Sequence, residues 1–327
     1  MLFQPCYNLF MSKISETSAK IKSSVSSVFK GNEDLVDMIL ACLFSGGHVL
    51  LEDVPGTGKT VLAKALAKST GLPFSRVQCT PDLMPSDVTG SSVWLPSSQK
   101  FEFRAGPVMS SVVLVDELNR ATPRTQSALL ECMAEKQVSV DGQLHKLENP
   151  FFVIATQNPV ESEGTFPLPE AQKDRFTMTL SMGYPSQEDE AAIITAQNST
   201  THPVEKVEAV VNRQNIIDCM EEAVTIHVEE SVMSYLLALV RQTRADYRLA
   251  AGVSPRGSIA LYKACQAYAA VKGRSYVVPE DIKLLALPVF RNRIILNSDS
   301  MLKGYSAEKI LLELIEQIPL PAFKAHV

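Results

Sequence analysis

The chain has 327 residues, of which 46% are hydrophobic and 20% charged, and its net charge is −5. This length predicts about two domains, and the composition is that of a folded globular protein. The acidic balance argues against sequence-independent binding of nucleic acid, because such binding needs clustered Lys and Arg. No window approaches the roughly 18 apolar residues of a membrane span, so we expect no membrane insertion. The six cysteines include no C-x-x-C pair, which favours reduced thiols and a cytoplasmic location.

The first part of the chain predicts helices. Residues 12–29 carry apolar side chains at helical spacing, and we assign residues 1–30 to an N-terminal helical segment. Residues 33–45 predict a second helix, which Gly46 and Gly47 end. The first ten residues lack the charged and apolar regions of a good signal peptide.

From residue 48 onward, short apolar runs alternate with helical patterns. The predicted strands are residues 48–52, 74–78, 111–117, 151–158 and 176–181. The predicted helices between them are residues 61–70 and 124–136. Residues 137–147 alternate around Asp141-Gly142, which is the strongest short signal for a hairpin. Strands that are apolar on both faces and alternate with helices imply a parallel sheet covered on both sides.

The pattern of apolar residues changes after Tyr184-Pro185. From there to the end we find helical periodicity, with a single short strand expected near residues 276–278. We therefore predict an α/β core at residues 31–184 and an α-helical domain at residues 185–327.

The stretch HVLLEDVPGTGKT predicts a phosphate-binding loop, or P-loop, between a strand and a helix. The pattern needs Gly, four residues and then Gly-Lys-Ser/Thr; Gly58 and the two residues after it fit, whereas Asp53 stands in place of the first Gly. Gly56 and Gly58 let backbone amides converge on an anion. The following helix adds its positive N-terminal end. The alternative is a glycine-rich turn without a ligand.

We expect this loop to bind ATP together with Mg²⁺. Lys59 would neutralise the β and γ phosphates, and Thr60 would ligate the metal ion. The residues expected to contact the nucleotide here are Pro55, Gly56, Thr57, Gly58, Lys59, Thr60 and Val61.

Polar residues at the ends of two later strands complete the predicted site. Asp116 and Glu117 end one buried strand, at the sheet edge where doubly wound folds bind ligands. Asp116 would hold Mg²⁺ through water, and Glu117 would deprotonate the attacking water. Asn158 ends the next strand and would position that water. The alternatives are the solvated start of a loop for the acidic pair and a helix or turn cap for Asn158.

Four stretches together resemble the MoxR family of AAA+ ATPases over roughly residues 28–325. They are LLEDVPGTGKT, VVLVDELNRATPRTQSALLECMAEKQVSVDG, FFVIATQNPVESEGTFPLPEAQKDRF and GVSPRGSIAL. The resemblance implies an αβα P-loop core with a five-stranded parallel sheet, followed by an all-α lid. It also implies an extra hairpin at residues 88–103, inserted in the second core helix. The hairpin at 137–147 would precede the first sensor strand.

The resemblance also implies roles for residues outside the P-loop. Arg175 matches the arginine finger that reaches the nucleotide of a neighbouring subunit, and Arg256 matches the second sensor at the start of a lid helix. Phe29 and Lys30, together with Gly31, fall where such proteins wrap the adenine. The alternatives are an ion pair with an acid such as Asp174 for Arg175, and an exposed arginine at a helix start for Arg256. Lys173 stands where the family often has an apolar residue.

These residues predict ATP hydrolysis in a homo-oligomeric ring, most simply a hexamer, because the finger comes from a neighbour. The family implies chaperone-like remodelling or maturation of protein complexes, including metal insertion, with a von Willebrand factor A domain protein as partner. The alternatives are a nucleic-acid motor, a chelatase-type motor subunit, and a nucleotide-gated binding module with negligible turnover. The predicted hairpins carry little positive charge, which favours a protein client over nucleic acid.

Overall fold

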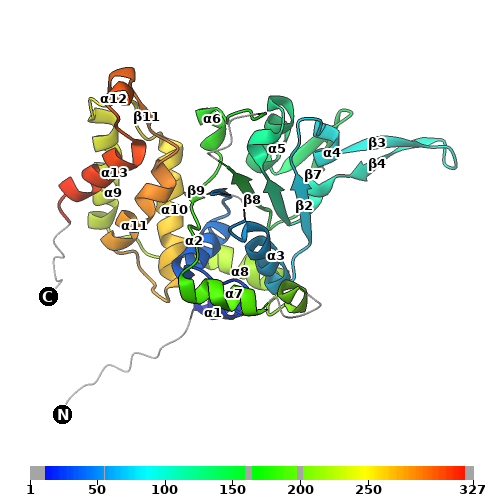
Figure 1. The fold of residues 1–327 in the computed structure, drawn as a ribbon, viewed down its shortest axis with the longest axis horizontal. Helices are drawn as coiled ribbons and strands as arrows, with labels where there is room; N and C mark the ends of the chain where they lie inside the picture. The colour runs from blue at the N-terminus through cyan, green and yellow to red at the C-terminus, as the bar shows by residue number, and fades with distance from the viewer. Residues whose placement is uncertain (1–11, 55, 159–163, 197–201, 321–327) are drawn as a thin grey trace, which may run out of the picture.

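A five-stranded parallel sheet forms the centre of the protein (Figure 1). The computed structural model of the chain describes residues 12–54, 56–158, 164–196 and 202–320. The strand order is β2-β5-β8-β1-β9. These strands are β1 (Val49–Glu52), β2 (Phe74–Gln78), β5 (Val112–Asp116), β8 (Phe152–Gln157) and β9 (Met178–Leu180). Each coincides with a predicted apolar run, and the predicted α/β P-loop fold is confirmed.

Both faces of β1, β5, β8 and β9 are largely buried, as their apolar runs require, whereas the edge strand β2 is partly exposed. Successive side chains of a strand point to opposite faces, so Val49 and Leu51 join one apolar cluster while Leu50 joins the other. On the first face pack α1 (Lys13–Ser26), α2 (Glu33–Phe44) and α3 (Lys59–Thr70). On the second face lies α5 (Pro123–Glu135), which begins where Thr122 accepts a hydrogen bond from the N–H of Thr125.

Two antiparallel hairpins interrupt the α/β order. The first, β3 (Gly90–Leu95) with β4 (Lys100–Ala105), follows the short α4 (Pro85–Thr89) and projects away from the body of the molecule (Figure 1). The second pairs β6 (Gln137–Val140) with β7 (Gln143–Lys146). Asp141 and Gly142 form its turn with positive φ angles of 49° and 77°, as the Asp-Gly pair predicts. Both expected hairpins are confirmed.

The rest of the chain is mainly helical. Its helices are α7 (Gln187–Ala196), α8 (Arg213–Ala223), α9 (Glu230–Ala245), α10 (Pro255–Val271), α11 (Pro279–Phe290), α12 (Ser298–Leu302) and α13 (Ala307–Gln317). Short helical turns elsewhere are η1 (Pro107–Met109), η2 (Leu118–Arg120), α6 (Glu170–Lys173) and η3 (Pro203–Lys206). Helices α9 to α13 gather on one side of the sheet, opposite the projecting β3–β4 hairpin (Figure 1).

The packing of α8 crosses the predicted domain boundary near residue 184. This helix contacts α1 and α2, while α10 packs along α2. One apolar cluster therefore runs from the sheet through α1 and α2 into the lid helices. The division into residues 1–30, 31–184 and 185–327 stays a prediction.

The helical part also contains a short two-stranded pair that the sequence did not predict. Strands β10 (Leu249–Ala251) and β11 (Ile295–Leu296) pair with each other. They are too short to show the alternation that marks a strand in a sequence. Near the short strand expected at 276–278, the structure has a single bridge between His227 and Tyr276.

A buried histidine, His48, joins the sheet to α5. Its Nδ1 accepts a hydrogen bond of 3.1 Å from the N–H of Val153, so its Nε2 carries the proton and donates to the carbonyl of Met133 at 3.3 Å. Burial lowers the pKa of His48 to about 4, against a weaker opposing effect of the Met133 carbonyl. The folded protein therefore favours the neutral ring.

We expect acid to destabilise the protein through His48. The pKa of His48 is about 4 when folded against 6.5 for an ordinary histidine, so its contribution is complete above pH 6.5 and is lost as the pH falls toward 4. Between pH 7 and pH 5 the loss amounts to about 2 kcal/mol of the free energy of unfolding. Urea unfolding at both pH values measures it. The variant His48→Gln cannot titrate at this position. Between pH 7 and pH 5 its free energy of unfolding should therefore fall by about 2 kcal/mol less than that of the wild type. Equal decreases in the two proteins contradict the prediction.

Candidate active site

The loop between β1 and α3 has the backbone geometry of an anion-binding site. Gly56 and Gly58 have φ angles of +86° and +91°, a region that side chains other than glycine rarely adopt. No atom lies within 4 Å of the position that a Cβ of Gly56 would take, so the loop is open to a ligand. The first helical residue after it is Lys59, which places the positive end of α3 at the loop. Pro55, also predicted to contact the nucleotide, lies outside the described residues.

Lys59 and Thr60 lie as the P-loop pattern predicts. The Nζ of Lys59 donates to the carbonyls of Asp53 at 2.8 Å and Val54 at 3.1 Å, so the ammonium group lies over the start of the loop. Burial lowers the pKa of Lys59, and the carboxylate of Asp53 opposes this most strongly. The Oγ1 of Thr60 is 3.5 Å from Oδ2 of Asp116. The hydroxyl of Thr60 on α3 and the carboxylate of Asp116 on β5 thus lie close together. Both groups offer oxygen atoms, which are the ligands that Mg²⁺ prefers.

Asp116 is buried at the carboxyl end of β5, and Arg76 on β2 is its strongest partner. The Nε of Arg76 donates to Oδ2 of Asp116 at 2.6 Å, and the hydroxyl of Thr156 on β8 donates to Oδ1 at 3.4 Å. The sequence reasoning missed Arg76 and Thr156, because neither belongs to a local pattern. Both lie here because β2 and β8 are the two neighbours of β5.

Glu117, the predicted general base, has a strained backbone. Its φ of 56° is uncommon for a residue other than glycine, and such strain often occurs at functional sites. Its N–H donates to the hydroxyl of Thr156 at 2.9 Å. Its carboxylate accepts from Gln78 at 2.9 Å and from Arg120 at 3.3 Å. These contacts fix the direction of the carboxylate beside the P-loop.

Most of the predicted phosphate-site residues line one cavity of about 330 Å³, while Thr57 lines the cavity that adjoins it. Asn158, directly after β8, also lines this cavity, and its backbone carbonyl accepts from Asn119 at 3.3 Å. The cavity is lined by Gly56, Gly58, Lys59, Thr60, Val61, Arg76, Gln78, Asp116, Glu117, Thr156 and Asn158.

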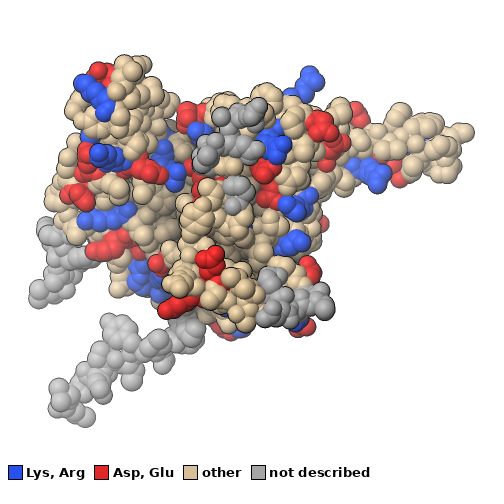
Figure 2. All heavy atoms as spheres, viewed as in Figure 1, with Lys and Arg blue, Asp and Glu red and all other residues tan. Residues whose placement is uncertain are grey.

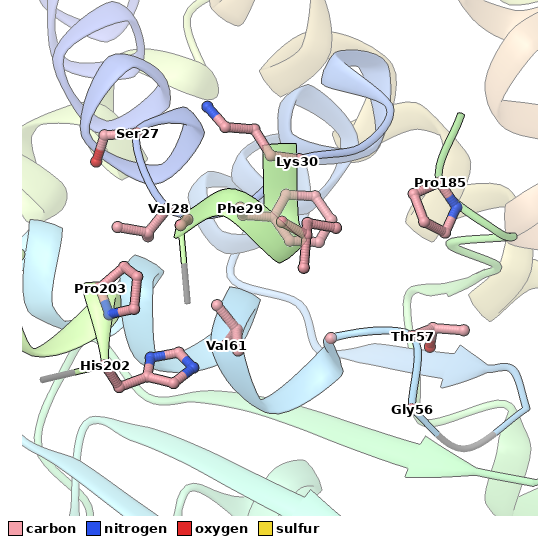
Figure 3. A pocket seen from close by; sticks show the side chains of 13 residues that line it. Ser27, Val28, Phe29, Lys30, Gly56, Thr57, Val61, Pro185, His202 and Pro203 are labelled. Carbon is pink, nitrogen blue, oxygen red and sulfur yellow. The ribbon is translucent and has the colours of Figure 1, made fainter. Parts of the chain in front are cut away.

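A second, more apolar cavity of about 230 Å³ adjoins the same loop (Figure 3). Phe29 and Lys30 line it as predicted; the Nζ of Lys30 turns back to the carbonyl of Ser26 at 2.6 Å, so the base of a nucleotide would meet its backbone and stem. His202 and Pro203 also line the cavity and were not predicted. The two cavities share Gly56, Gly58 and Val61, so a base in one and phosphates in the other fit the shape of ATP.

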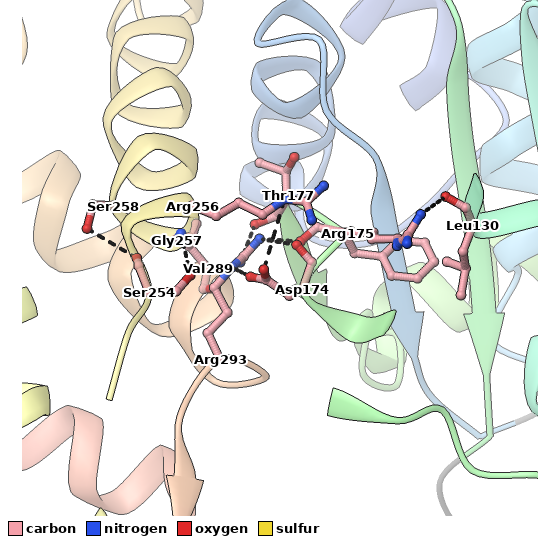
Figure 4. Close-up of polar contacts among 11 residues, drawn as sticks. Leu130, Asp174, Arg175, Thr177, Ser254, Arg256, Gly257, Ser258, Val289 and Arg293 are labelled. Atoms are coloured by element: carbon pink, nitrogen blue, oxygen red, sulfur yellow. Dashed lines mark hydrogen bonds and ion pairs between the residues drawn. The ribbon is translucent and has the colours of Figure 1, made fainter. Parts of the chain in front are cut away.

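Arg175 and Arg256 lie outside both cavities. Arg175 donates to the carbonyl of Leu130 at 2.6 Å, and the Nε of Arg256 is 3.9 Å from a carboxylate oxygen of Asp174 (Figure 4). Arg175 follows Asp174 in the chain but contacts Leu130, Arg256 approaches Asp174, and neither arginine lines a cavity at the P-loop of its own chain. Lys173 pairs with Glu170 at 3.1 Å on α6.

Comparison with known proteins decides the family. A model described as the ATPase family associated with various cellular activities (AAA) matches residues 48–178, and an AAA lid domain matches residues 241–314. Chaperone MoxR1 of Mycobacterium tuberculosis is 37% identical over 310 residues, which cover 92% of this chain and 81% of that protein. The chain belongs to the MoxR family of AAA+ ATPases.

Two further relatives cover almost the whole chain. The protein YeaC of Bacillus subtilis is 46% identical over 308 residues, which cover 94% of this chain and 96% of that protein. The crystal structure of a candidate ATPase from Cytophaga hutchinsonii matches with a TM-score of 0.87 and 36% identity, covering 95% of this chain and 97% of that one. The resemblance stated from the sequence is thus confirmed. Within the described residues, no helix has both the length and the apolar character needed to cross a membrane.

Asp53, which replaces the first glycine of the P-loop pattern, anchors the segment that leaves β9. Its carboxylate accepts from the hydroxyl of Ser181 at 2.9 Å, from the N–H of Gly183 at 3.3 Å and from the N–H of Met182. Because the side chain is buried, these donors replace water around the charge. The residue therefore links the start of the P-loop to the chain that leads into the helical part.

We expect Asp53→Gly to destabilise the protein, although it restores the usual P-loop pattern. It removes a buried charged acceptor of three hydrogen bonds, which should lower the free energy of unfolding by about 3 kcal/mol. Ser181→Ala is the matched control, since it removes one of the three bonds and should cost about 1 kcal/mol. Chemical unfolding without nucleotide measures both. A glycine variant as stable as the wild type contradicts this role for Asp53.

Proposed function

We propose that this protein hydrolyses ATP at the β–γ phosphoanhydride, within a hexameric ring, to remodel or mature protein complexes. The observation that carries the proposal is the cavity of about 330 Å³ beside the P-loop. There the hydroxyl of Thr60 lies 3.5 Å from Asp116, with Glu117 and Asn158 in the same wall. Each residue type matches one need of phosphoryl transfer. Lys59 supplies positive charge for the phosphates, and Thr60 and Asp116 supply oxygen ligands for Mg²⁺. Glu117 is a base, and Asn158 is a neutral group that can position water.

The proposed reaction is attack of water on the γ-phosphorus of ATP, in line with the bond to the bridging β–γ oxygen, which breaks as ADP leaves. Thr60 and Asp116 would hold Mg²⁺, which supplies neutralising charge when it is bound. Lys59 would leave the carbonyls that it now contacts and bind the β and γ phosphates. Glu117 would accept the proton of the attacking water, and the amide of Asn158 would orient that water.

Neither of the two predicted arginines, Arg175 and Arg256, lines this cavity of its own chain. Arg175 and Arg256 both lie beside Asp174, outside the two cavities around the P-loop. If the surface that carries these arginines contacts the P-loop surface of an identical neighbour, two different surfaces meet. Such head-to-tail contacts form a ring when the rotation between subunits closes. We propose that both act in trans, where an arginine finger can contribute ~10³–10⁵ in rate.

The proposed client is a protein rather than a nucleic acid. The β3–β4 hairpin exposes apolar side chains, among them 48% of Trp94 and 70% of Phe101, whose rings meet edge to face at 5.2 Å. Figure 2 shows that the outer part of this projection is largely uncharged. Nucleic-acid motors need positive charge at such a site, and one relative carries the name of a chaperone. We further propose a von Willebrand factor A domain partner, metal insertion as one form of maturation, and a cytoplasmic location, as the resemblance predicts.

We expect Glu117→Gln to separate ATP binding from hydrolysis. The amide keeps the size of the side chain and its acceptor oxygen but cannot take a proton, so turnover should fall by about 10²–10⁴-fold. The affinity for ATP with Mg²⁺ should stay within about threefold, because the P-loop is unchanged. Calorimetry and steady-state phosphate release measure the two quantities. Wild-type turnover in this variant contradicts the assignment of the base.

We expect two inactive variants to restore each other if the finger acts in trans. Lys59→Ala lacks a working P-loop and Arg175→Ala lacks the finger, so each alone should lose turnover. In mixed rings, about one junction in four combines an intact P-loop with an intact finger. Co-expression with two different tags and purification on both gives such rings. Recovery of about a quarter of wild-type turnover supports the proposal, and no recovery from assembled mixed rings contradicts it.

A further inference from the structure

The turn after α11 ties the lid to the core at the site of the two arginines. Its last residue, Arg293, has only 4% of its side chain exposed. Its Nε donates to Oδ1 of Asp174 at 2.7 Å, and its NH2 group donates to the carbonyls of Asp174 at 3.1 Å and Phe176 at 2.6 Å. Its NH1 group donates to the carbonyl of Thr177 at 3.1 Å and to that of Val289 (Figure 4).

These contacts surround the proposed finger without touching its side chain. Residues 174–177 connect α6 to β9 and carry Arg175, so the backbone on both sides of the finger accepts hydrogen bonds from one guanidinium. A guanidinium is planar and permanently charged, with five donors in a fixed arrangement. A buried group of this kind therefore determines the position of the segment more strictly than a flexible ammonium would.

The same guanidinium also packs against the helix that carries the second arginine. Arg256 lies in the first turn of α10, and its neighbour Gly257 leaves room for Arg293: a Cβ at Gly257 would come within 2.8 Å of the Cδ of Arg293. The carboxylate of Asp174 lies between the two arginines, 2.7 Å from Arg293 and 3.9 Å from Arg256. One buried side chain of the lid thus contacts both elements that present the proposed trans arginines.

We infer that Arg293 is a positioning residue for hydrolysis in the neighbouring subunit: it fixes the segment of Arg175 and the helix turn of Arg256 relative to each other. The inference rests on the proposed function, because it assumes that the two arginines act in trans. It also gives the lid a direct mechanical link to the next active site. A shift of α11 displaces Arg293, and the turn that carries the finger moves with it.

Arg293→Gln tests this role. The variant should bind ATP with wild-type affinity, because its own P-loop is intact, while its kcat falls by about 10–100-fold and its KM stays within about threefold. The decisive measurement is the mixed ring with Lys59→Ala. Because the defect lies on the finger side only, these rings should recover about a quarter of wild-type turnover, as rings of Arg175→Ala with Lys59→Ala do. Rings of Arg293→Gln with the double variant Lys59→Ala/Arg175→Ala should not recover.

Two further variants separate positioning from a general loss of stability. Asn292→Ala removes a hydrogen bond of 2.7 Å from the same turn to Thr179 on β9, away from the finger segment, and should keep turnover within about twofold. Arg293→Lys keeps the charge but not the fork of donors, so its kcat should lie between those of wild type and Arg293→Gln. Thermal unfolding of each variant reports its folding.

The outcomes distinguish this inference from the proposed function. If Arg175→Ala with Lys59→Ala fails to recover, the finger does not act in trans and the proposed function fails. If that pair recovers but Arg293→Gln keeps wild-type turnover, or fails to assemble or recover with Lys59→Ala, the positioning role of Arg293 is overturned.

Discussion

The carboxyl edge of the parallel sheet is the constraint on which the site depends. Strands β1, β5 and β8 are adjacent and run in the same direction, so their ends meet at one edge. The P-loop follows β1, Asp116 ends β5 with Glu117 next to it, and Asn158 directly follows β8. Residues separated by a hundred positions in the chain therefore line one cavity. Packing on both faces of the sheet determines the register of the strands, and the register determines the distance between Thr60 and Asp116.

The same architecture keeps Arg175 and Arg256 out of the cavity at the P-loop of their own chain, although Arg76 lines that cavity. The finger segment follows α6 at the far side of β9, and the helical part packs against that side of the sheet. In the proposed ring, an identical neighbour supplies these two arginines, and hydrolysis depends on how two subunits meet. Arg293 connects the lid to this subunit contact, because its buried side chain contacts both the finger segment and α10.

Side chains at the site are also controlled by neighbours that have no role in the predicted chemistry. Gln78 and Arg120 bind the carboxylate of Glu117, and Arg76 binds Asp116. Each of these contacts adds a hydrogen-bond donor to a carboxylate at the phosphate site. The arrangement suits a site that exchanges these partners for a nucleotide and a metal ion.

The sequence by itself determined the P-loop, the acidic pair, the five core strands and the hairpin at residues 137–147, whereas the hairpin at 88–103 followed from the family resemblance. The first four depend on local chemistry: glycines at positive φ, apolar runs of strand length, and an Asp-Gly turn. The tertiary structure alone decided the roles of Arg76, Thr156, His202 and Arg293. None belongs to a local pattern, and the partner of Arg293, Asp174, is 119 positions away. A sequence shows which residues can donate or carry charge; only the packing of sheet and lid decides which of them become buried against each other.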